Sequence, residues 1–259
     1  MLGDQLIDVH AKPRIVAPFT DLDPGLTPED AYRAAAILHR HRLAAGWKPI
    51  GRKIGFTNRT IWPRYEIYEP IWGMVYDRTF VPSRENEAEI PLAGLVQPRI
   101  EPEICFGLKA RPRIGHLLDA IEWVAHSIEI VQCHHPDWKF RLPDTIAGNG
   151  LHGRLTLGER IPLERVPGLA EALPRLRVTL MNGERVVDRG MGSNVLDSPL
   201  AALAHLVSIL ESQPDSPPLE AGEIVSTGTL TDAHPVTPGE TWSTQIAGLP
   251  LRGLTVRFT

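Results

Sequence analysis

The sequence predicts an α+β protein built mainly on a mixed or antiparallel sheet. Strand-like segments outnumber helical ones, and most of them lie in the second two-thirds of the chain. The 22 Gly and 24 Pro among 259 residues provide the turns that many short strands require. We divide the chain into a small N-terminal α/β region, residues 1–80, and a sheet-rich catalytic domain, residues 81–259.

The composition is that of a globular, enzyme-sized chain, with 42% hydrophobic residues and a net charge of -4. The sequence contains no block of Lys and Arg, so we do not expect nucleic acid as a partner. It contains no apolar run long enough to span a bilayer and no signal-peptide pattern, so we expect no membrane partner and a cytoplasmic location. Cys105 and Cys133 are expected to be free thiols.

In the N-terminal region the clearest element is a helix over residues 28–45. Thr27 is a suitable N-cap, Pro28 suits the first helical position and Asp30 completes a capping-box pattern. Gly46 ends the helix. Strand-like segments follow at 53–57 and 71–76.

The central segment predicts a strand, a helix and a second strand. Residues 96–108 and 126–132 alternate as strands do. Between them, residues 117–125 have apolar side chains at helical spacing, which predicts a helix there.

The last third of the chain predicts a hairpin, a helix and three strands. Asn182-Gly183 lies between two alternating runs in residues 177–188, a strong hairpin signal. A helix is expected over 199–211 with Ser198 as its cap, followed by strands at 223–229, 240–246 and 252–258.

Three glutamates on the two central strands suggest a metal site. Glu101 and Glu103 share one face of their strand, and Glu129 lies on the next strand. Half-buried carboxylates would repel one another unless a cation lay between them, and all-oxygen ligands favour Mg²⁺ or Mn²⁺. The alternative is that Glu101 and Glu103 lie on a solvated face and that Glu129 pairs with an arginine.

Six segments, in this order and spacing, resemble the fumarylacetoacetate hydrolase superfamily. They are DPGLTPEDAYRA (23–34), KIGFT (53–57), RIEPEICFGL (99–108), IEIVQCHHPDWKF (128–140), DTIAGNG (144–150) and GEIVSTGTLTDAHPVTPGE (222–240). Within the superfamily the sequence is most similar to the branch of 2-keto-4-pentenoate hydratase and 4-oxalocrotonate decarboxylase. The resemblance implies a sheet-rich fold of that family, a mixed β-roll, with a small N-terminal helical region.

The resemblance also implies a function. Glu101, Glu103 and Glu129 match the family's ligands for Mg²⁺ or Mn²⁺. The implied enzyme is a lyase on small 2-oxo or 2-hydroxydienoic acids, foremost a hydratase that adds water through a metal-bound dienolate. A homo-oligomer, and association with a pathway partner enzyme, are further expectations.

Four more residues match positions in the family pattern. Lys53 matches the active-site lysine, and Asp77 matches an acid that could orient water or Lys53, although it could equally form a turn. Lys139 lies in a D-W-K segment beside the metal strand, and Thr229 lies in a loop near the substrate; both are implied substrate-binding residues. Trp62, Trp72 and Trp138 would suit either an apolar pocket wall or the core.

The sequence departs from the branch at two motifs. Where its hydratases read E-(V/I)-V-D-S-R and A-D-N-A-S-S-G, this chain reads EIVQCH from Glu129 and AGNGLHG from Ala147. Two histidines, His134 and His152, appear in these motifs. His134, His135 and His152 could act as acid or base, with His152 the catalytic candidate, or could simply fill loops. The polar groups that would place water and bind a distal carboxylate are gone.

These departures leave other functions open. The first is a decarboxylase of the 4-oxalocrotonate type, and the second is an acylpyruvate-type C–C hydrolase. Such hydrolases use a His–Glu pair on a lid, for which residues 53–99 offer no convincing equivalent. The third is a non-catalytic metal-binding partner subunit.

Overall fold

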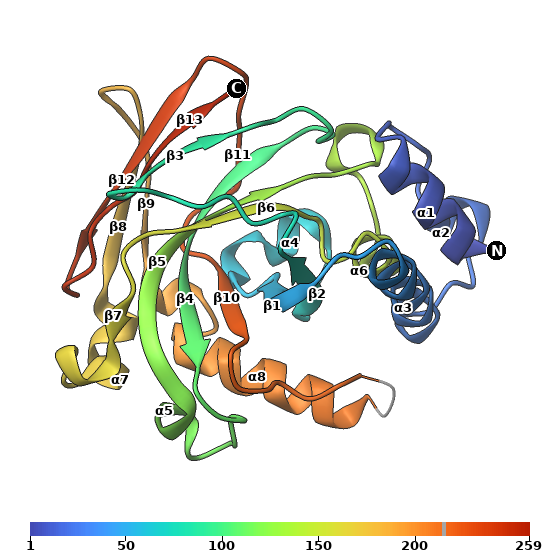
Figure 1. Cartoon of the computed structure of the whole chain (residues 1–259). Coiled ribbons are helices and arrows are strands. Elements are labelled where there is room, and N and C mark those ends of the chain that lie inside the picture. The colour runs from blue at the N-terminus through green and yellow to red at the C-terminus, as the bar shows by residue number, and fades with distance from the viewer. Residues whose placement is uncertain (214–215) are drawn as a thin grey trace.

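The structure is a computed structural model that describes residues 1–213 and 216–259 (Figure 1). Its helices are α1 Leu2–Ala11, α2 Phe19–Leu22, α3 Pro28–Ala44, α4 Trp62–Tyr65, α5 Leu117–Ala120, α6 Leu142–Ala147, α7 Leu169–Ala172 and α8 Pro199–Ser212. Its strands are β1 Pro49–Gly55, β2 Ile71–Tyr76, β3 Glu87–Ile90, β4 Arg99–Leu108, β5 Ile121–Val131, β6 His152–Leu157, β7 Ile161–Pro162, β8 Arg177–Asn182, β9 Arg185–Met191, β10 Ile224–Thr229, β11 His234–Pro235, β12 Thr241–Ala247 and β13 Thr255–Phe258.

The strands form two mixed sheets, which confirms the predicted α+β class. The larger, eight-stranded sheet has the order β2-β1-β10-β4-β5-β6, with β11 beside β4 and β7 beside β5. The smaller, five-stranded sheet has the order β3-β13-β12-β8-β9. Only β1–β10 and β3–β13 pair in parallel among the strands described. The two longest strands, β4 and β5, are curved and run through the centre of the molecule (Figure 1).

One face of β4 and β5 is covered by apolar side chains. Near one end of the strands, Ile100 and Ile128 pack with Trp242 and Phe258 of the smaller sheet. Further along, Phe106 and its neighbours belong to a larger apolar cluster that includes the buried residues of α8. This double cover leaves the opposite face of β4 and β5 to carry the glutamates, because side chains alternate along a strand.

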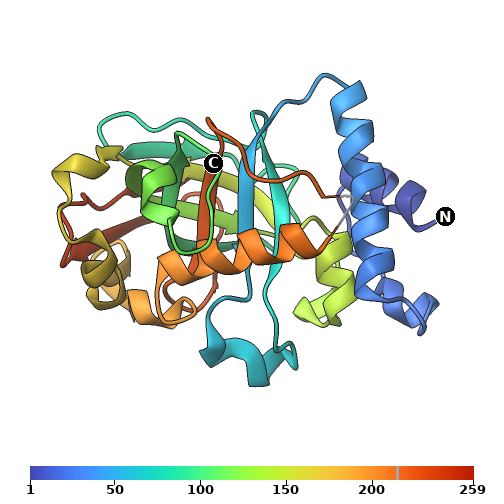
Figure 2. The ribbon, with the colours of Figure 1, turned by 90° about the horizontal axis from the view of Figure 1, so that it is seen from below.

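The N-terminal helices pack together at one side of the molecule (Figure 2). Leu6 of α1, Ala34 and Leu38 of α3, and Ile146 of α6 share one buried cluster. The capping box of Thr27 and Asp30 is present, which confirms the predicted start of α3. Neither α1 nor α6 was predicted from a local sequence pattern. Strands β1 and β2 pair within the larger sheet, and a domain boundary near residue 80 remains a prediction.

The helix predicted over residues 117–125 is wrong beyond its first turn. Only Leu117–Ala120 is helical, and Ile121 already begins β5. The Cα of Ile121 pairs with that of Leu108, and the Cα of Val124 pairs with that of Phe106. The segment therefore forms a strand beside β4 and not a helix. Ile121 and Val124 are β-branched and fully buried, and such side chains pack better on a sheet than in a four-residue helix.

The other predicted elements form close to their expected places. The hairpin at Asn182-Gly183 joins β8 and β9, with Gly183 at a positive φ of 57°. The Ser198 hydroxyl accepts a hydrogen bond from the Leu200 amide at 3.3 Å and caps α8. In the described part of the chain, no helix has the length and apolar character needed to cross a membrane.

Candidate active site

Three glutamates lie together on β4 and β5. The Cα of Glu101 pairs with that of Glu129 across the two antiparallel strands, so both side chains point to the same face. Carboxylate oxygens of Glu101, Glu103 and Glu129 all lie within 4.8 Å of one another. Glu103 and Glu129 are fully buried and Glu101 is half-buried. The alternative of a solvated carboxylate face is therefore wrong.

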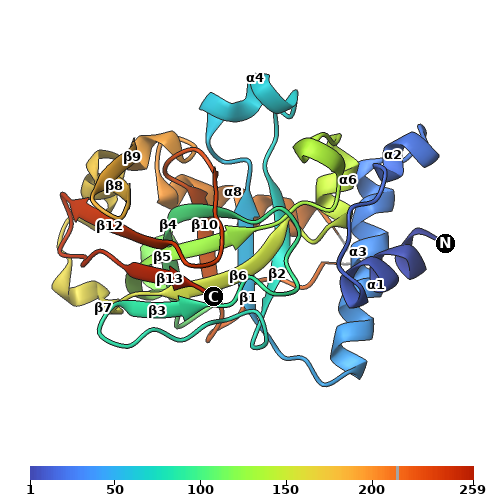
Figure 3. The same ribbon diagram turned by 90° about the horizontal axis from the view of Figure 1, so that it is seen from above.

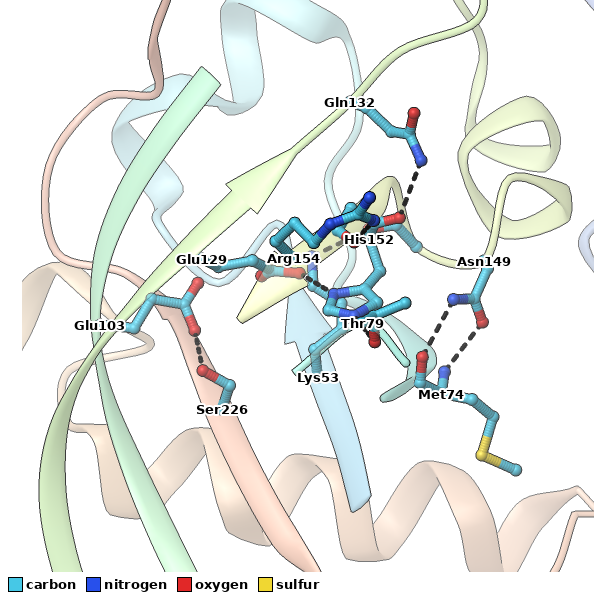
Figure 4. Close-up of polar contacts among 12 residues, drawn as sticks. Lys53, Met74, Thr79, Glu103, Glu129, Gln132, Asn149, His152, Arg154 and Ser226 are labelled. Carbon is cyan, nitrogen blue, oxygen red and sulfur yellow. Dashed lines mark hydrogen bonds and ion pairs between the residues drawn. The ribbon is translucent and has the colours of Figure 1, made fainter. Parts of the chain in front are cut away.

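Of the two carboxylate oxygens of Glu103, one has hydrogen-bond partners and the other has none. Its Oε2 accepts a hydrogen bond from the Ser226 hydroxyl at 2.5 Å (Figure 4) and a second from the Gly228 amide at 3.0 Å. Its Oε1 is buried and has no hydrogen-bond partner. Gly228 has a φ of +96°, and a Cβ there would lie 1.8 Å from Oγ1 of Thr57, so the close approach of this amide requires glycine.

Glu129 is contacted from two directions. Its Oε1 lies 2.7 Å from Nδ1 of His152, and its Oε2 lies 3.3 Å from Nζ of Lys53 (Figure 4). The Lys53 ammonium also donates a hydrogen bond to the Gly150 carbonyl at 2.8 Å. The arginine partner considered for Glu129 in the alternative reading is replaced by this lysine and histidine.

The Gly150 carbonyl is aimed at Lys53 by a left-handed turn. Asn149, Gly150 and Leu151 have φ values of 58°, 63° and 62°. The Asn149 side chain fixes this turn, because it accepts a bond from the Met74 amide at 2.9 Å and donates to the Met74 carbonyl at 3.0 Å. The strained backbone at Leu151 is thus maintained by hydrogen bonds to β2.

His152 links Glu129 to Thr79. Its Nε2 lies 2.8 Å from the Thr79 hydroxyl, and that oxygen accepts a hydrogen bond from the Tyr76 amide at 3.1 Å. Burial lowers the pKa of His152, which favours the neutral ring. A neutral ring that donates from Nδ1 to the Glu129 carboxylate accepts at Nε2. The Thr79 hydroxyl has one proton, which it can donate either to Nε2 or to the Tyr76 carbonyl 3.0 Å away.

The site brings together three carboxylates and one ammonium, and the pKa values of these groups are shifted. Burial, reinforced by Glu129 and Glu101, raises the pKa of Glu103 well above its usual value, and burial raises the pKa of Glu101 to about 7. The pKa of Glu129 is lowered, because Lys53 and His152 together outweigh the effect of burial. The pKa of Lys53 is raised, since the three carboxylates outweigh the desolvation that acts on the ammonium.

These residues fit a divalent cation. One lysine faces three carboxylates, and the unpartnered Oε1 of Glu103 lies inside the cluster. All donors are carboxylate oxygens, which suit a hard ion such as Mg²⁺ or Mn²⁺. Glu101, Glu103 and Glu129 therefore form a carboxylate cluster able to bind such a metal ion.

A cavity that is open to solvent reaches this cluster. Lys53, Glu101 and Thr229 line it, so the structure brings three of the predicted site residues together. The Thr229 hydroxyl donates to the Thr231 carbonyl at 3.0 Å, and the Cα of Thr229 pairs with that of Glu103. Trp138 lines the cavity, whereas Trp62 and Trp72 are not among its lining residues.

Two predicted residues lie elsewhere. Asp77 is exposed in the turn after β2, where its Oδ1 accepts bonds from the amides of Lys48 and Arg78 at 3.0 and 2.9 Å. The turn-forming alternative for Asp77 thus describes its position, and the structure does not support a catalytic one. Lys139 is exposed and does not line the cavity.

The other two histidines, His134 and His135, lie against the N-terminal region and not beside the glutamates. Both line a separate small cavity together with Leu6 and His10 of α1. Their Nδ1 atoms lie 3.1 and 3.3 Å from the carbonyls of Arg14 and Val16.

Several site residues were not anticipated from the sequence. Ser226 and Thr79 support Glu103 and His152, and the Gly150 carbonyl holds Lys53. Ser226 precedes Thr229 within a segment that carries the family resemblance, so it could have been weighed as a neighbour of Glu103. Thr79 and the Gly150 carbonyl gave no local signal, because their roles depend on contacts between distant segments.

Fold and site together define an enzyme class in which carboxylates on a curved sheet form a divalent-metal site at the base of a cavity. Comparison with known proteins gives the family: the fumarylacetoacetate (FAA) hydrolase C-terminal model matches residues 85–257, and the chain belongs to this family.

Characterised relatives cover most of the chain. It is 33% identical over 254 residues to the 2-hydroxyhexa-2,4-dienoate hydratase of Comamonas testosteroni, which covers 95% of this chain and 93% of that protein. It is 30% identical over 239 residues to a 4-oxalocrotonate decarboxylase of a Pseudomonas species, covering 91% and 89%. The chain also resembles the solved structure of the Pseudomonas putida G7 4-oxalocrotonate decarboxylase complexed with magnesium and adipate. That likeness has a TM-score of 0.89 at 27% identity and covers 100% of this chain and 96% of the other.

Proposed function

We propose that this chain is a divalent-metal-dependent lyase on small 2-oxo or 2-hydroxydienoic acids, foremost a hydratase of the 2-keto-4-pentenoate type. The observation that carries the proposal is the buried glutamate cluster at the base of a cavity, with Oε1 of Glu103 unpartnered. Relatives named as hydratases at about 30% identity over most of the chain support the same reaction class.

In this proposal Glu101, Glu103 and Glu129 hold Mg²⁺ or Mn²⁺. A bound ion would supply Lewis-acid polarisation of the 2-oxo group of the substrate. The protein fixes the ligands beforehand: Ser226 and Gly228 orient Glu103, and His152 orients Glu129. His152 is therefore proposed as a positioning residue that acts through Glu129.

Lys53 is proposed to stabilise negative charge on the substrate. Its ammonium lines the cavity and is kept in place by Glu129 and the Gly150 carbonyl. Hydration of a 2-hydroxydienoic acid requires a proton shift to the conjugated ketone and attack of water at C4, with negative charge on the C2 oxygen. A buried cation beside that oxygen stabilises this charge more than a solvated one would. Thr229 is proposed to contact the C1 carboxylate.

Decarboxylation is the second candidate. It is favoured by the likeness to the 4-oxalocrotonate decarboxylase of Pseudomonas putida G7 over the whole chain. Decarboxylation and hydration share the development of a dienolate, so the glutamate cluster and Lys53 would serve both.

The test is an assay with 2-hydroxypenta-2,4-dienoate, 4-oxalocrotonate and an acylpyruvate, each with and without Mg²⁺. We expect Mg²⁺-dependent loss of the dienol absorbance without release of CO₂. Release of CO₂ from 4-oxalocrotonate would instead identify a decarboxylase, and cleavage of the acylpyruvate a C–C hydrolase. Inactivity on all three would contradict an enzymatic role and favour a metal-binding partner subunit.

The cytoplasmic location, a homo-oligomeric state and association with a pathway enzyme remain proposals.

A further inference from the structure

Part of the cavity is lined by aromatic side chains. The Tyr65 ring stacks on Phe140 with a centroid distance of 5.2 Å and an interplanar angle of 11°. Phe56 meets both rings edge-on, at 5.8 Å from Tyr65 and 6.1 Å from Phe140. Trp138 lies 6.3 Å from Phe140. We call Phe56, Tyr65, Trp138 and Phe140 the aromatic wall; all four line the cavity.

Two segments far apart in the sequence build this wall. Tyr65 ends α4, whose segment projects from the body of the molecule between β1 and β2 (Figure 3). Trp138 and Phe140 come from the loop that follows β5. Ile61 and Leu151 extend the apolar surface on either side. The wall is therefore a formed apolar surface in the same cavity as Lys53 and Glu101.

Among the described lining residues, the cations are already paired. Nζ of Lys53 lies 3.3 Å from Oε2 of Glu129. Arg64 is more than half exposed, and its Nη2 lies 2.9 Å from Oδ2 of Asp232.

Arg99 lies behind the wall and does not line the cavity. Its guanidinium is 4.1 Å from the centroid of Trp138, and its Nη1 donates to the Tyr65 hydroxyl at 3.1 Å. A carboxylate placed against the wall would therefore lose water and meet no cation among the described lining residues that is not already paired, whereas an apolar group would gain from burial.

We propose that the aromatic wall is the subsite for the end of the substrate remote from its C1 carboxylate, and that it selects an uncharged, apolar substituent. The preferred substrates are then monocarboxylic 2-hydroxydienoic acids with an alkyl or similar tail, and dicarboxylic acids are disfavoured. This inference rests on the proposed function, because it takes the glutamate end of the cavity as the site of the 2-oxo acid group.

The direct test compares unreactive 2-oxo acids by calorimetry on the full chain with Mg²⁺. Pyruvate has no tail, and 2-oxohexanoate and 2-oxoadipate have six carbons each and differ only in a terminal methyl or carboxylate. Since each fully buried methylene strengthens binding about fourfold, we expect 2-oxohexanoate to bind at least about tenfold more tightly than pyruvate. We also expect it to bind at least about tenfold more tightly than 2-oxoadipate.

Variants of the wall separate its contribution from that of the glutamates. Phe140→Ala should weaken 2-oxohexanoate about tenfold and leave pyruvate within twofold. Phe140→Arg should reverse the preference in favour of 2-oxoadipate, which keeps the test available if the alanine variant does not fold. Tyr68→Ala, at an exposed aromatic of the same projecting segment, is the matched control and should change neither affinity.

The outcomes distinguish the two proposals. Equal or tighter binding of 2-oxoadipate by the unmodified chain, with pyruvate binding and hydratase activity present, would overturn the apolar subsite alone. Failure of all three acids to bind with Mg²⁺ would overturn both proposals.

Discussion

Nδ1 of His152 lies 2.7 Å from Oε1 of Glu129, and neither side chain is accessible to solvent. The contact joins the start of β6 to the last part of β5 and occupies one of the two carboxylate oxygens of a proposed metal ligand. Thr79 completes the arrangement on the far side of the ring. His152, which differs from the family pattern, therefore supports Glu129, a fully buried member of the glutamate cluster.

Replacing His152 should weaken metal binding. Loss of the partner of a ligand commonly reduces metal affinity about 10–100-fold, and we expect this for Mg²⁺ in His152→Leu. His152→Asn is the matched control, because its amide can donate to Glu129 from nearly the position of Nδ1, and it should retain most of the affinity. Calorimetric titration with Mg²⁺ measures both. Equal weakening in the two variants would argue against a hydrogen-bonding role.

Replacing Glu103 should make thermal stability insensitive to metal. In the unmodified chain, Mg²⁺ at about 100 times its dissociation constant should add about 2.7 kcal/mol to the free energy of unfolding. In Glu103→Gln this increase should vanish, while the metal-free stability rises because one of three crowded carboxylates is neutral.

Glu89→Gln, at an exposed acid on β3, should behave like the unmodified chain. Thermal unfolding in EDTA and in Mg²⁺ gives the comparison. An undiminished Mg²⁺ effect in Glu103→Gln would be inconsistent with its role as a ligand.

Removal of the Lys53 charge should abolish activity and destabilise the metal-free protein. Breaking a buried ion pair by deleting one partner costs about 3 kcal/mol or more, and Lys53→Met leaves Glu129 without its cation. Urea unfolding in EDTA should show this loss, and the hydratase assay should show no turnover. Lys48→Met, at an exposed lysine just before β1, is the control and should change neither the stability nor the activity. Unchanged stability of Lys53→Met would show that the Lys53–Glu129 ion pair contributes little.

Acid should loosen the N-terminal helices. His10 and His134 lie with their ring centroids 5.2 Å apart, and burial lowers the pKa of both, with Arg42 adding to the effect at His10. A lowered pKa means that the folded chain prefers the neutral rings. The resulting stability is complete above the unfolded value of about 6.5 and is lost as the pH falls below it.

We therefore expect a smaller free energy of unfolding at pH 5 than at pH 7.5, with a weaker pH dependence in His134→Gln. The exposed His116→Gln variant is the control. Chemical denaturation at the two pH values tests this; an identical pH dependence of all three proteins would count against the histidine pair.

Local sequence patterns were sufficient for the strands that carry the site. Alternation placed Glu101 and Glu103 on one face, and the structure confirms that face as shared with Glu129. The segment 117–125 was misjudged because Ile121 and Val124 satisfy a helical spacing equally well, and only pairing with β4 decides between the two.

What local pattern could not supply was contact between distant segments. The Gly150 carbonyl reaches Lys53 because Asn149 is bonded to Met74, and these residues belong to separate parts of the chain. Asp77 and Lys139 were assigned to the site by position in a motif; both are exposed and neither lines the cavity. The register between strands, and not residue type, determines which side chains meet.

Glu101, Glu103 and Glu129 are expected to bind one divalent cation. Calorimetric titration of the metal-free chain with Mg²⁺ and Mn²⁺ measures this binding. We expect one ion bound per chain and loss of binding in Glu103→Gln; absence of uptake, or unchanged uptake by that variant, would show that the three glutamates do not form a metal site.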